Sequence, residues 1–518
     1  MMPQAIEAPF WHALLPRLGS PAEFSAARDL FGRCKFDYAN VCRRVGVEHL
    51  YLLTTKLEGE YLKRPVGDGL DAFLRLFVIG RGMEWPEVER LVGGEGAACL
   101  EALQLLARQP DRCQFGFAPV MALPSPGGAV MVCDRNSSPE GVAIGQPTAD
   151  ALYPALFPNT LDFVARFPQT PCESILEIGT GTGTGAIQWA KLAREVWATD
   201  ITPRAVHFAE FNRRLAGADN VRVVEGDLYQ PVEGLTFDRI ACHPPFVPAK
   251  KSAVIFRDGG EDGEQIVRRV VEGLPRFLRP GGLFWASFMI SDRAGEPAEA
   301  RIRTWLGESE VEFDIGLAID TRRTVAETIA HTVLNGIGSP EEVCYFGDLW
   351  RGNRTEYLVH ASVLIRRQAC SGEGPREPVT ARTQAGKGFA ARHLEWLLDW
   401  NAAQREPGFA QQVLACRPVL APVCELRAVH RLEAGKAVTE EFSVEAEGPL
   451  RVSCRVPGWL AKMLVACDGS LSAREWFEAL RGGGSIPENG DPLEFVQIVS
   501  GLVSAGVLNP IIPSPPAD

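Results

Sequence analysis

The spacing of apolar residues in the first 139 positions predicts helices followed by a β-hairpin. In the segments 70–77 and 86–92 apolar side chains recur at helical spacing, and glycines follow both segments. Two later apolar runs, 115–123 and 129–133, flank the turn sequence PSPGG, which favours a hairpin. Helices followed by a two-stranded ribbon predict a winged-helix-like domain over residues 1–139.

From residue 140 to 367 the pattern changes to short apolar β-type runs that alternate with amphipathic helical segments. The expected strands are residues 174–178, 195–199, 221–224, 237–241 and 283–288. The expected helices between them are residues 184–193, 204–215 and 263–278. This alternation predicts an α/β fold in which helices cover parallel strands. Residues 357–365 are expected to add a final edge strand, with 294–356 as a long insertion before it.

The last third of the chain returns to a helical pattern. Residues 368–388 are rich in glycine, proline and charge, and we expect a linker there. Three amphipathic helices are predicted after it, at 458–466, 471–480 and 495–503. The last one runs into the sequence AGVL, which is typical of an exit from a helix into a strand. Residues 389–518 are therefore predicted to form a second winged-helix-like domain.

The composition is that of an ordinary folded protein, and its charge is acidic. The 518 residues are 46% hydrophobic, which is enough for two to four domains. With 53 Lys and Arg against 65 Asp and Glu, the formal charge is −12. Phosphate binding needs an excess of cations, so nucleic acid is a disfavoured partner, although one basic face can lie inside an acidic total.

Cysteine and histidine spacing argues against the common zinc motifs, and we expect no bound metal. The 13 cysteines include no C-x-x-C pair, and the eight histidines include no H-x-x-x-H pair. Dispersed cysteines in a long chain are typical of reduced thiols, so we expect a cytoplasmic protein. The N-terminal residues lack the pattern of a signal peptide, and no long apolar run predicts a membrane span.

The strongest chemical signal is the sequence LEIGTGTGTG at residues 176–185. It follows a predicted strand and precedes a predicted helix, and its alternating glycines let the backbone approach a ligand and turn into the helix. No Gly-Lys-Ser/Thr follows, so a P-loop is excluded. Glu177, two positions before the first glycine, suits a cationic amino-acid group better than a pyrophosphate.

The next three predicted strands also end in residues with candidate chemistry. Asp200 lies about 20 residues past the glycines, where an acid accepts both hydroxyls of a ribose. The third strand ends in the sequence EGD, and its Asp227 can reach an adenine amino group. The fourth strand ends in the sequence CHPPF at residues 242–246.

The order of these motifs, one at each strand end, resembles that of the class I S-adenosylmethionine-dependent methyltransferases. The motifs are E-x-G-x-G-x-G, D, G-D and x-P-P-F. The x-P-P-F element and the sequence RDGGEDG at 257–263 are similar to the branch that includes the release-factor glutamine methyltransferases. The segment 142–151 also resembles the one that precedes the core there. The resemblance covers about residues 140–290. It implies a Rossmann-like core with a mostly parallel seven-stranded sheet, and S-adenosyl-L-methionine as the cofactor.

The resemblance also implies roles for individual residues of the cofactor site. The residues implied to hold the methionyl part are Glu177, Gly179, Gly181 and Gly183. Asp200 would bind the ribose, Ile201 would lie against the adenine, and Asp227 would meet the adenine edge.

The acceptor motif departs from the family at His243. Relatives that methylate planar nitrogens usually have Asn or Asp there, and that side chain and the following carbonyl, here of Pro244, accept hydrogen bonds from the target NH₂. Phe246 can still stack on a planar acceptor. A neutral histidine accepts one hydrogen bond or removes a proton, so His243 leaves amide, amine, hydroxyl and carboxyl acceptors open. It can also simply fill the strand end.

Three hypotheses for the function follow. The first is a methyltransferase that modifies a nitrogen or oxygen of a small molecule or peptide, with terminal domains that shape the acceptor site or mediate homodimerisation. The second is an RNA or DNA base methyltransferase, because x-P-P-F also occurs in enzymes that act on exocyclic amines. The third is a non-catalytic regulator that senses S-adenosylmethionine.

Overall fold

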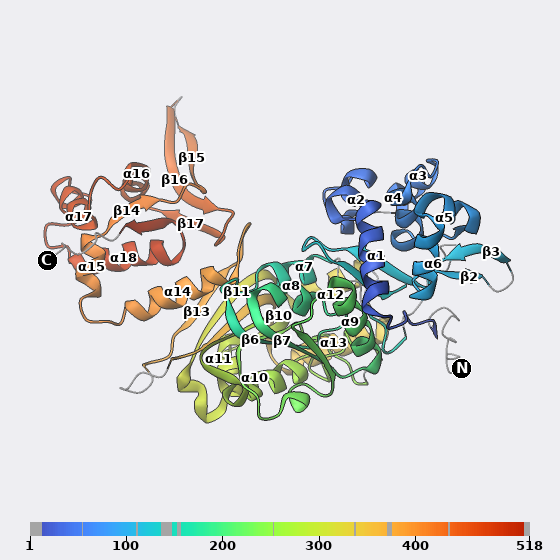
Figure 1. Cartoon of the computed structure of the whole chain (residues 1–518). Helices are drawn as coiled ribbons and strands as arrows, with labels where there is room; N and C mark the ends of the chain where they lie inside the picture. Colours follow the sequence, from blue (N-terminus) through green and yellow to red (C-terminus); the bar gives the residue numbers. More distant parts are fainter. Residues whose placement is uncertain are drawn as a thin grey trace, which may run out of the picture. The chain divides into compact units, whose positions relative to one another are not determined.

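In the computed structural model the chain forms two compact units. Figure 1 labels the helices and strands along the chain. The residues that it describes are 13–53, 55–109, 112–135, 148–152, 157–251, 253–335, 338–369, 376–433 and 436–511. The first unit takes its described residues from the ranges Met1–Ala165, Gln169–Phe288 and Ser339–Leu349. The second unit takes its described residues from Arg166–Pro168, Met289–Gly338 and Trp350–Asp518. No helix in these described parts of the chain is long and apolar enough to cross a membrane.

The N-terminal part of the first unit is helical, as its sequence predicts. Its helices are α1 (Pro21–Arg33), α2 (Tyr38–Val45), α3 (Thr55–Leu62), α4 (Gly69–Phe73), α5 (Trp85–Val92) and α6 (Gly94–Ala102). Its strands are β1 (Met83–Glu84), β2 (Ala107–Gln109), β3 (Arg112–Phe117), β4 (Val120–Pro124) and β5 (Val130–Asp134). The predicted hairpin is present as β4–β5. Its first run is divided, however, because β3 pairs with β1 and β2 instead.

The core of these N-terminal elements continues onto the α/β region. Phe24 of α1 packs edge-to-face on Phe211 of α9 (Pro203–Ala216), with ring centroids 5.1 Å apart. Asn212 of the same helix accepts a hydrogen bond from the Val132 N–H and donates one to the Val132 carbonyl, both at 2.8 Å. Because these contacts are buried, the N-terminal elements and the α/β region share one hydrophobic core.

The α/β part of the first unit contains the alternation expected from the sequence. Its strands are β6 (Cys172–Ile178), β7 (Ala193–Asp200), β8 (Val221–Glu225), β9 (Phe237–Cys242) and β10 (Leu278–Arg293), which continues into the second unit. Its helices include α7 (Pro158–Ala165), α8 (Thr184–Trp189), α9 and α10 (Gln265–Phe277). The strands are parallel in the order β10-β9-β6-β7-β8. The strand order reverses at β6, and ligands of open α/β sheets bind at the carboxyl ends beside such a point.

The sheet has eight strands rather than the expected seven. Beyond β10 it continues through β12 (Thr355–Arg367), β11 (Phe313–Thr324) and β13 (Thr380–Gln384). The expected edge strand, β12, is therefore an interior strand, antiparallel to β11. Strand β11 lies inside the predicted insertion, and β13 lies inside the predicted linker and runs parallel to β11.

A polar residue explains why β11 was not predicted. Asp314 lies on this strand with no exposed surface. It accepts hydrogen bonds from Arg366 at 3.0 Å and from Arg376 at 2.5 Å. A buried carboxylate is stable when such cations pair with it, so the strand interior tolerates a residue that interrupts its apolar pattern.

The second unit also contains α11 (Ala298–Trp305), α12 (Val325–Leu334) and the end of α13 (Pro340–Gly352), whose first part belongs to the first unit. Five further helices and two small sheets complete the described part of the second unit. The helices are α14 (Ala391–Ala403), α15 (Phe409–Ala415), α16 (Gly458–Ala466), α17 (Ala473–Gly482) and α18 (Pro492–Ser504). The strands are β14 (Arg417–Leu420), β15 (Cys424–Glu433), β16 (Lys436–Ala446), β17 (Val452–Val456) and β18 (Leu508–Ile511). The last three helices and β18 coincide with the predicted elements.

Candidate active site

The glycine loop leaves β6 in a conformation that only glycine adopts easily. Gly179, Gly181 and Gly183 have φ values of +70°, +55° and +82°, in the left-handed region that side chains with a Cβ disfavour. The Gly179 N–H donates to the Thr199 carbonyl at 2.8 Å, which ties the loop to β7. A Cβ built on Gly179 or Gly181 would meet no heavy atom within 4 Å. The loop therefore presents bare backbone to open space.

Glu177 lies beneath this loop with its side chain buried. Its carboxylate accepts hydrogen bonds from the Thr180 hydroxyl at 2.5 Å and from the Ala186 N–H at 2.8 Å. Burial raises the pKa of Glu177 to about 7, since removal from water penalises the charged form more than the two hydrogen bonds favour it. A nearby cation would lower this pKa again. The residue is thus suited to a ligand that brings a positive charge.

Asp200 ends β7 and braces the glycine loop from the side. Its carboxylate accepts the Gly181 N–H at 2.9 Å and the Thr202 N–H at 3.0 Å. Burial raises the pKa of Asp200, against the effect of these hydrogen bonds. Ile201 follows, with 54% of its surface exposed.

Asp227 lies two residues beyond β8, as predicted, but it has an ion-pair partner that the sequence did not indicate. Its carboxylate accepts a hydrogen bond from Arg269 of α10 at 2.6 Å. The neighbouring Arg268 pairs with Asp262 at 2.9 Å. Both arginines are therefore neutralised by acids, and a ligand at Asp227 would share its carboxylate with Arg269.

His243 follows β9 and is held by an aromatic stack. Its ring lies on Phe163 of α7, with centroids 5.2 Å apart and an angle of 18° between the planes. Phe163 is fixed in turn, because its carbonyl accepts the indole N–H of Trp285 at 3.0 Å. The Phe246 ring is 6.5 Å from His243, and Pro244 between them is buried. No spacing rule pointed to Phe163, which lies 80 residues earlier in the chain.

The RDGGEDG sequence forms a loop that packs on the acceptor motif. The Gly259 N–H donates to the Val247 carbonyl at 2.8 Å, and the Val247 N–H donates to the Arg257 carbonyl at 2.9 Å. A Cβ on Gly259 would lie 2.6 Å from the Pro245 carbonyl oxygen. Glycine is therefore required there, since any side chain would push the loop away from the motif.

A segment of α13 contacts this loop from about 85 residues further along the chain. Glu342 forms an ion pair with Arg257. The Tyr345 hydroxyl donates to the Glu261 carbonyl at 2.6 Å, and the ammonium of Lys250 lies 4.8 Å from the Tyr345 ring centre. Glu342 and Tyr345 were not predicted to lie near this loop, because nothing in the local sequence indicates so distant a contact.

The fold and the loop define the class of the α/β region. Residues 159–311 match the family model described as "Methyltransferase small domain". Together with the parallel strand order and the glycine loop at the end of β6, this match identifies a Rossmann-like core of the class I methyltransferase type.

Curated relatives of this core include release factor glutamine methyltransferases. The enzyme of Moorella thermoacetica is 36% identical over 129 residues, which are 22% of this chain and 45% of the relative. The enzyme of Clostridium acetobutylicum is 30% identical over 173 residues, which are 30% of this chain and 58% of the relative. The chain thus spans about half the length of these relatives.

Solved structures also resemble the chain. The ribosomal protein L11 methylase from Lactobacillus delbrueckii subsp. bulgaricus is 20% identical, with 40% of this chain and 75% of that chain covered and a TM-score of 0.24. The precorrin-6y C5,15-methyltransferase from Geobacter metallireducens GS-15 is 14% identical, with 42% of this chain and 94% of that chain covered and a TM-score of 0.26.

Proposed function

We propose that this protein transfers a methyl group from S-adenosyl-L-methionine to a side-chain nitrogen of a peptide or protein acceptor. The observation that carries the proposal is the placement of the four motifs at the carboxyl ends of the neighbouring parallel strands β6, β7, β8 and β9. The choice of a peptide nitrogen draws on the relatives, which are named as glutamine methyltransferases.

The residues of the glycine loop fit this cofactor. Open space over Gly179 and Gly181 leaves room for a ligand against the backbone, and the buried carboxyl of Glu177 suits the ammonium of its methionyl part. Asp200 would accept a hydrogen bond from the ribose; its carboxylate already accepts from the Gly181 N–H and from the Thr202 N–H and hydroxyl, which hold it at the end of β7. The exposed Ile201 would cover one face of the adenine, and Asp227 would accept from its edge.

The acceptor would bind beside His243. S-adenosylmethionine supplies a methyl group on a positively charged sulfur, which leaves as a neutral thioether. The Pro244 carbonyl and neutral His243 accept hydrogen bonds from the acceptor nitrogen, and Phe246 stacks on its planar group. The nitrogen loses a proton as it gains the methyl group, and His243 would take that proton. The stack on Phe163 supports this proposal, because it restricts rotation of the imidazole.

The proposal also covers the location of the protein, its domain boundaries and its partners. We infer a cytoplasmic protein from its dispersed cysteines. Boundaries at 1–139, 140–367 and 389–518, with a linker at 368–388, stay predictions, as do the winged-helix-like character of the flanking domains and their role in acceptor binding or homodimerisation. The acidic charge and the ion pairs of Arg268 and Arg269 argue against a nucleic-acid acceptor.

Methyl transfer from labelled S-adenosylmethionine to a panel of acceptors tests the proposal. The panel contains glutamine-rich peptides, total RNA and the small-molecule fraction of a lysate, and the Asp200→Ala variant serves as the inactive control. Label in peptides with the wild type alone supports the proposal. Label confined to RNA would establish the base methyltransferase instead, and S-adenosylhomocysteine binding without any labelled product would establish the sensing regulator.

A further inference from the structure

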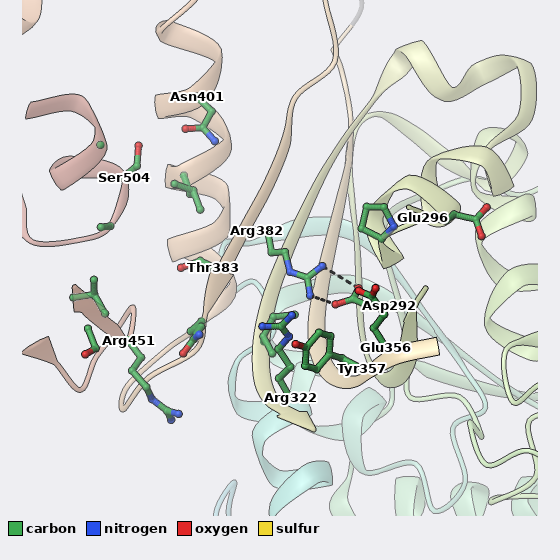
Figure 2. Close-up of a pocket in the computed structure, with 18 of the residues that line it drawn as sticks. Asp292, Glu296, Arg322, Glu356, Tyr357, Arg382, Thr383, Asn401, Arg451 and Ser504 are labelled. Carbon is green, nitrogen blue, oxygen red and sulfur yellow. Dashed lines mark hydrogen bonds and ion pairs between the residues drawn. The ribbon is translucent and has the colours of Figure 1, made fainter. Parts of the chain in front are cut away.

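The second unit contains a cavity of about 870 Å³ at the end of its strands (Figure 2). One wall is formed by the last residues of β10, by Arg322 near the end of β11, by the end of β13 and by Tyr357 near the start of the antiparallel β12. The other wall comes from α14, from Arg451 and the start of β17, and from α18. Ligands of open α/β sheets bind outside the carboxyl ends of strands, and this volume is in the usual range for a small molecule.

Backbone hydrogen bonds join the two walls. The Gly386 N–H donates to the Pro449 carbonyl at 2.9 Å, and the Lys387 N–H donates to the Glu447 carbonyl at 2.7 Å. The Arg451 N–H donates to the Gln384 carbonyl at 2.9 Å. A Cβ on Gly386 would lie only 2.3 Å from the Glu447 carbonyl oxygen, so the two segments are in the closest contact that backbones allow. These hydrogen bonds hold the end of β13 against the segment that leads into β17, and both segments line the cavity.

Acids already neutralise one of the arginines in the cavity. Arg382 donates to both carboxylate oxygens of Asp292, at 2.5 and 3.0 Å, and to Glu299 at 2.8 Å. Figure 2 shows the bidentate pair with Asp292 as dashed lines. Because these contacts fix Arg382 in place, this residue helps to shape the cavity wall.

Two other arginines keep their charge available. Arg322 is exposed, and its guanidinium lies 3.5 Å from the centre of the Tyr357 ring. It is close enough to Asp292 to help lower the pKa of that carboxyl, but no ion pair of Arg322 within 4 Å is formed among the described residues. Arg451 is also exposed, and its guanidinium contacts no partner among the described residues. The lining also contains three acids: Asp292 is paired with Arg382, Glu296 lies 4.0 Å from Arg293, and Glu356 carries a third negative charge. The cavity therefore offers two guanidinium groups in a chain whose net charge is −12.

We propose that this cavity binds a small organic or inorganic molecule that carries a phosphate or carboxylate group. Arg322 and Arg451 each supply a guanidinium group from one wall of the cavity, and such groups pair with oxyanions in a fixed geometry. Asn401, Thr383 and Ser504 supply hydrogen bonds to the rest of the ligand. The site is separate from the glycine loop and does not rest on the proposed methyl transfer.

Isothermal titration with pyrophosphate and with citrate tests this inference. The full chain is used with S-adenosylhomocysteine present, so that the glycine loop does not add to the signal. We expect saturable binding of at least one probe at one site. The stronger of the two probes then identifies phosphate or carboxylate as the preferred group. Arg322→Ala and Arg451→Ala should each weaken this binding by roughly 10-fold or more.

Arg455→Ala is the matched control. Arg455 lies on β17, four residues after Arg451. Its side chain is 82% exposed and pairs with Glu441, and it does not line the cavity. It should bind the probes like the wild type, and all three variants should keep the melting temperature of the wild type. The absence of saturable binding of both probes to the wild type would overturn the inference. An equal loss in Arg455→Ala would do so as well, because it would reveal nonspecific attraction to surface charge.

Discussion

The buried carboxyl of Glu177 allows a quantitative prediction about pH. Its pKa is raised from 4.5 to about 7 in the folded protein, so the folded state holds this proton more tightly than the unfolded chain does. The stabilisation is fully present below about pH 4.5 and is lost as the pH rises through 7. The shift of about 2.5 pKa units corresponds to about 3 kcal/mol of unfolding free energy. Glu177→Gln removes the charge that burial penalises, and it should therefore be more stable than the wild type at pH 8.

The same substitution should abolish the pH dependence of cofactor binding. A cationic ammonium pairs with the ionised form of Glu177, and roughly a tenth of the groups are ionised one pH unit below the pKa. We therefore expect the affinity of the wild type for S-adenosylhomocysteine to increase roughly 10-fold between pH 6 and pH 8. Asp200 shifts in the same direction and adds to the effect at lower pH. In Glu177→Gln the binding should be weak at every pH.

Urea denaturation and calorimetry between pH 5 and pH 8 measure both effects. Glu173→Gln is the control, because Glu173 lies on the same strand with an exposed side chain. It should follow the wild type in both assays. If Glu177→Gln binds S-adenosylhomocysteine as tightly as the wild type, or if its stability changes with pH as that of the wild type does, the reasoning about the buried carboxyl is wrong.

Three further substitutions test the site. Asp200→Ala should abolish S-adenosylhomocysteine binding in calorimetry, since it removes the ribose acceptor and releases Gly181 and Thr202; unchanged affinity would contradict the assignment. His243→Ala should keep that affinity and reduce kcat for methyl transfer, and unaltered turnover would leave His243 a purely structural residue. Gly185→Ala should destabilise the protein by about 1–3 kcal/mol in urea, because its Cβ would lie 2.1 Å from the Glu177 carboxylate; a neutral effect would mean that Glu177 moves freely.

Local sequence signals predicted where the glycine loop and the residues at the next strand end lie in the fold. The glycine loop, Asp200 and Ile201 lie directly at strand ends, so the order of strands along the chain was enough to place them. The alternation of apolar runs likewise predicted β6 to β9 within two residues at each end, whereas β10 extends five residues beyond its predicted bounds on both sides. These features depend on neighbours in the sequence, and no distant contact changes them.

Contacts between distant segments account for what the sequence did not reveal. Strand β11 was missed because Asp314 is buried against Arg366 and Arg376, which follow more than 50 residues later. The partner of Asp227 and the aromatic support of His243 come from helices that no motif links to them. Tyr345 contacts the loop formed by the RDGGEDG sequence only because α13 packs against that loop. The spacing of residues along the chain carries no signal for such pairs, because their members are far apart in the sequence.

Locating the transferred methyl group by tandem mass spectrometry tests the central claim most directly. Peptides from a lysate treated with the purified protein and labelled S-adenosylmethionine are fragmented, and the labelled atom is identified. We predict a single methyl group on a side-chain nitrogen, present with the wild type and absent with Asp200→Ala. A methyl group on a carboxyl or hydroxyl oxygen, or no labelled peptide at all, would contradict the proposed reaction.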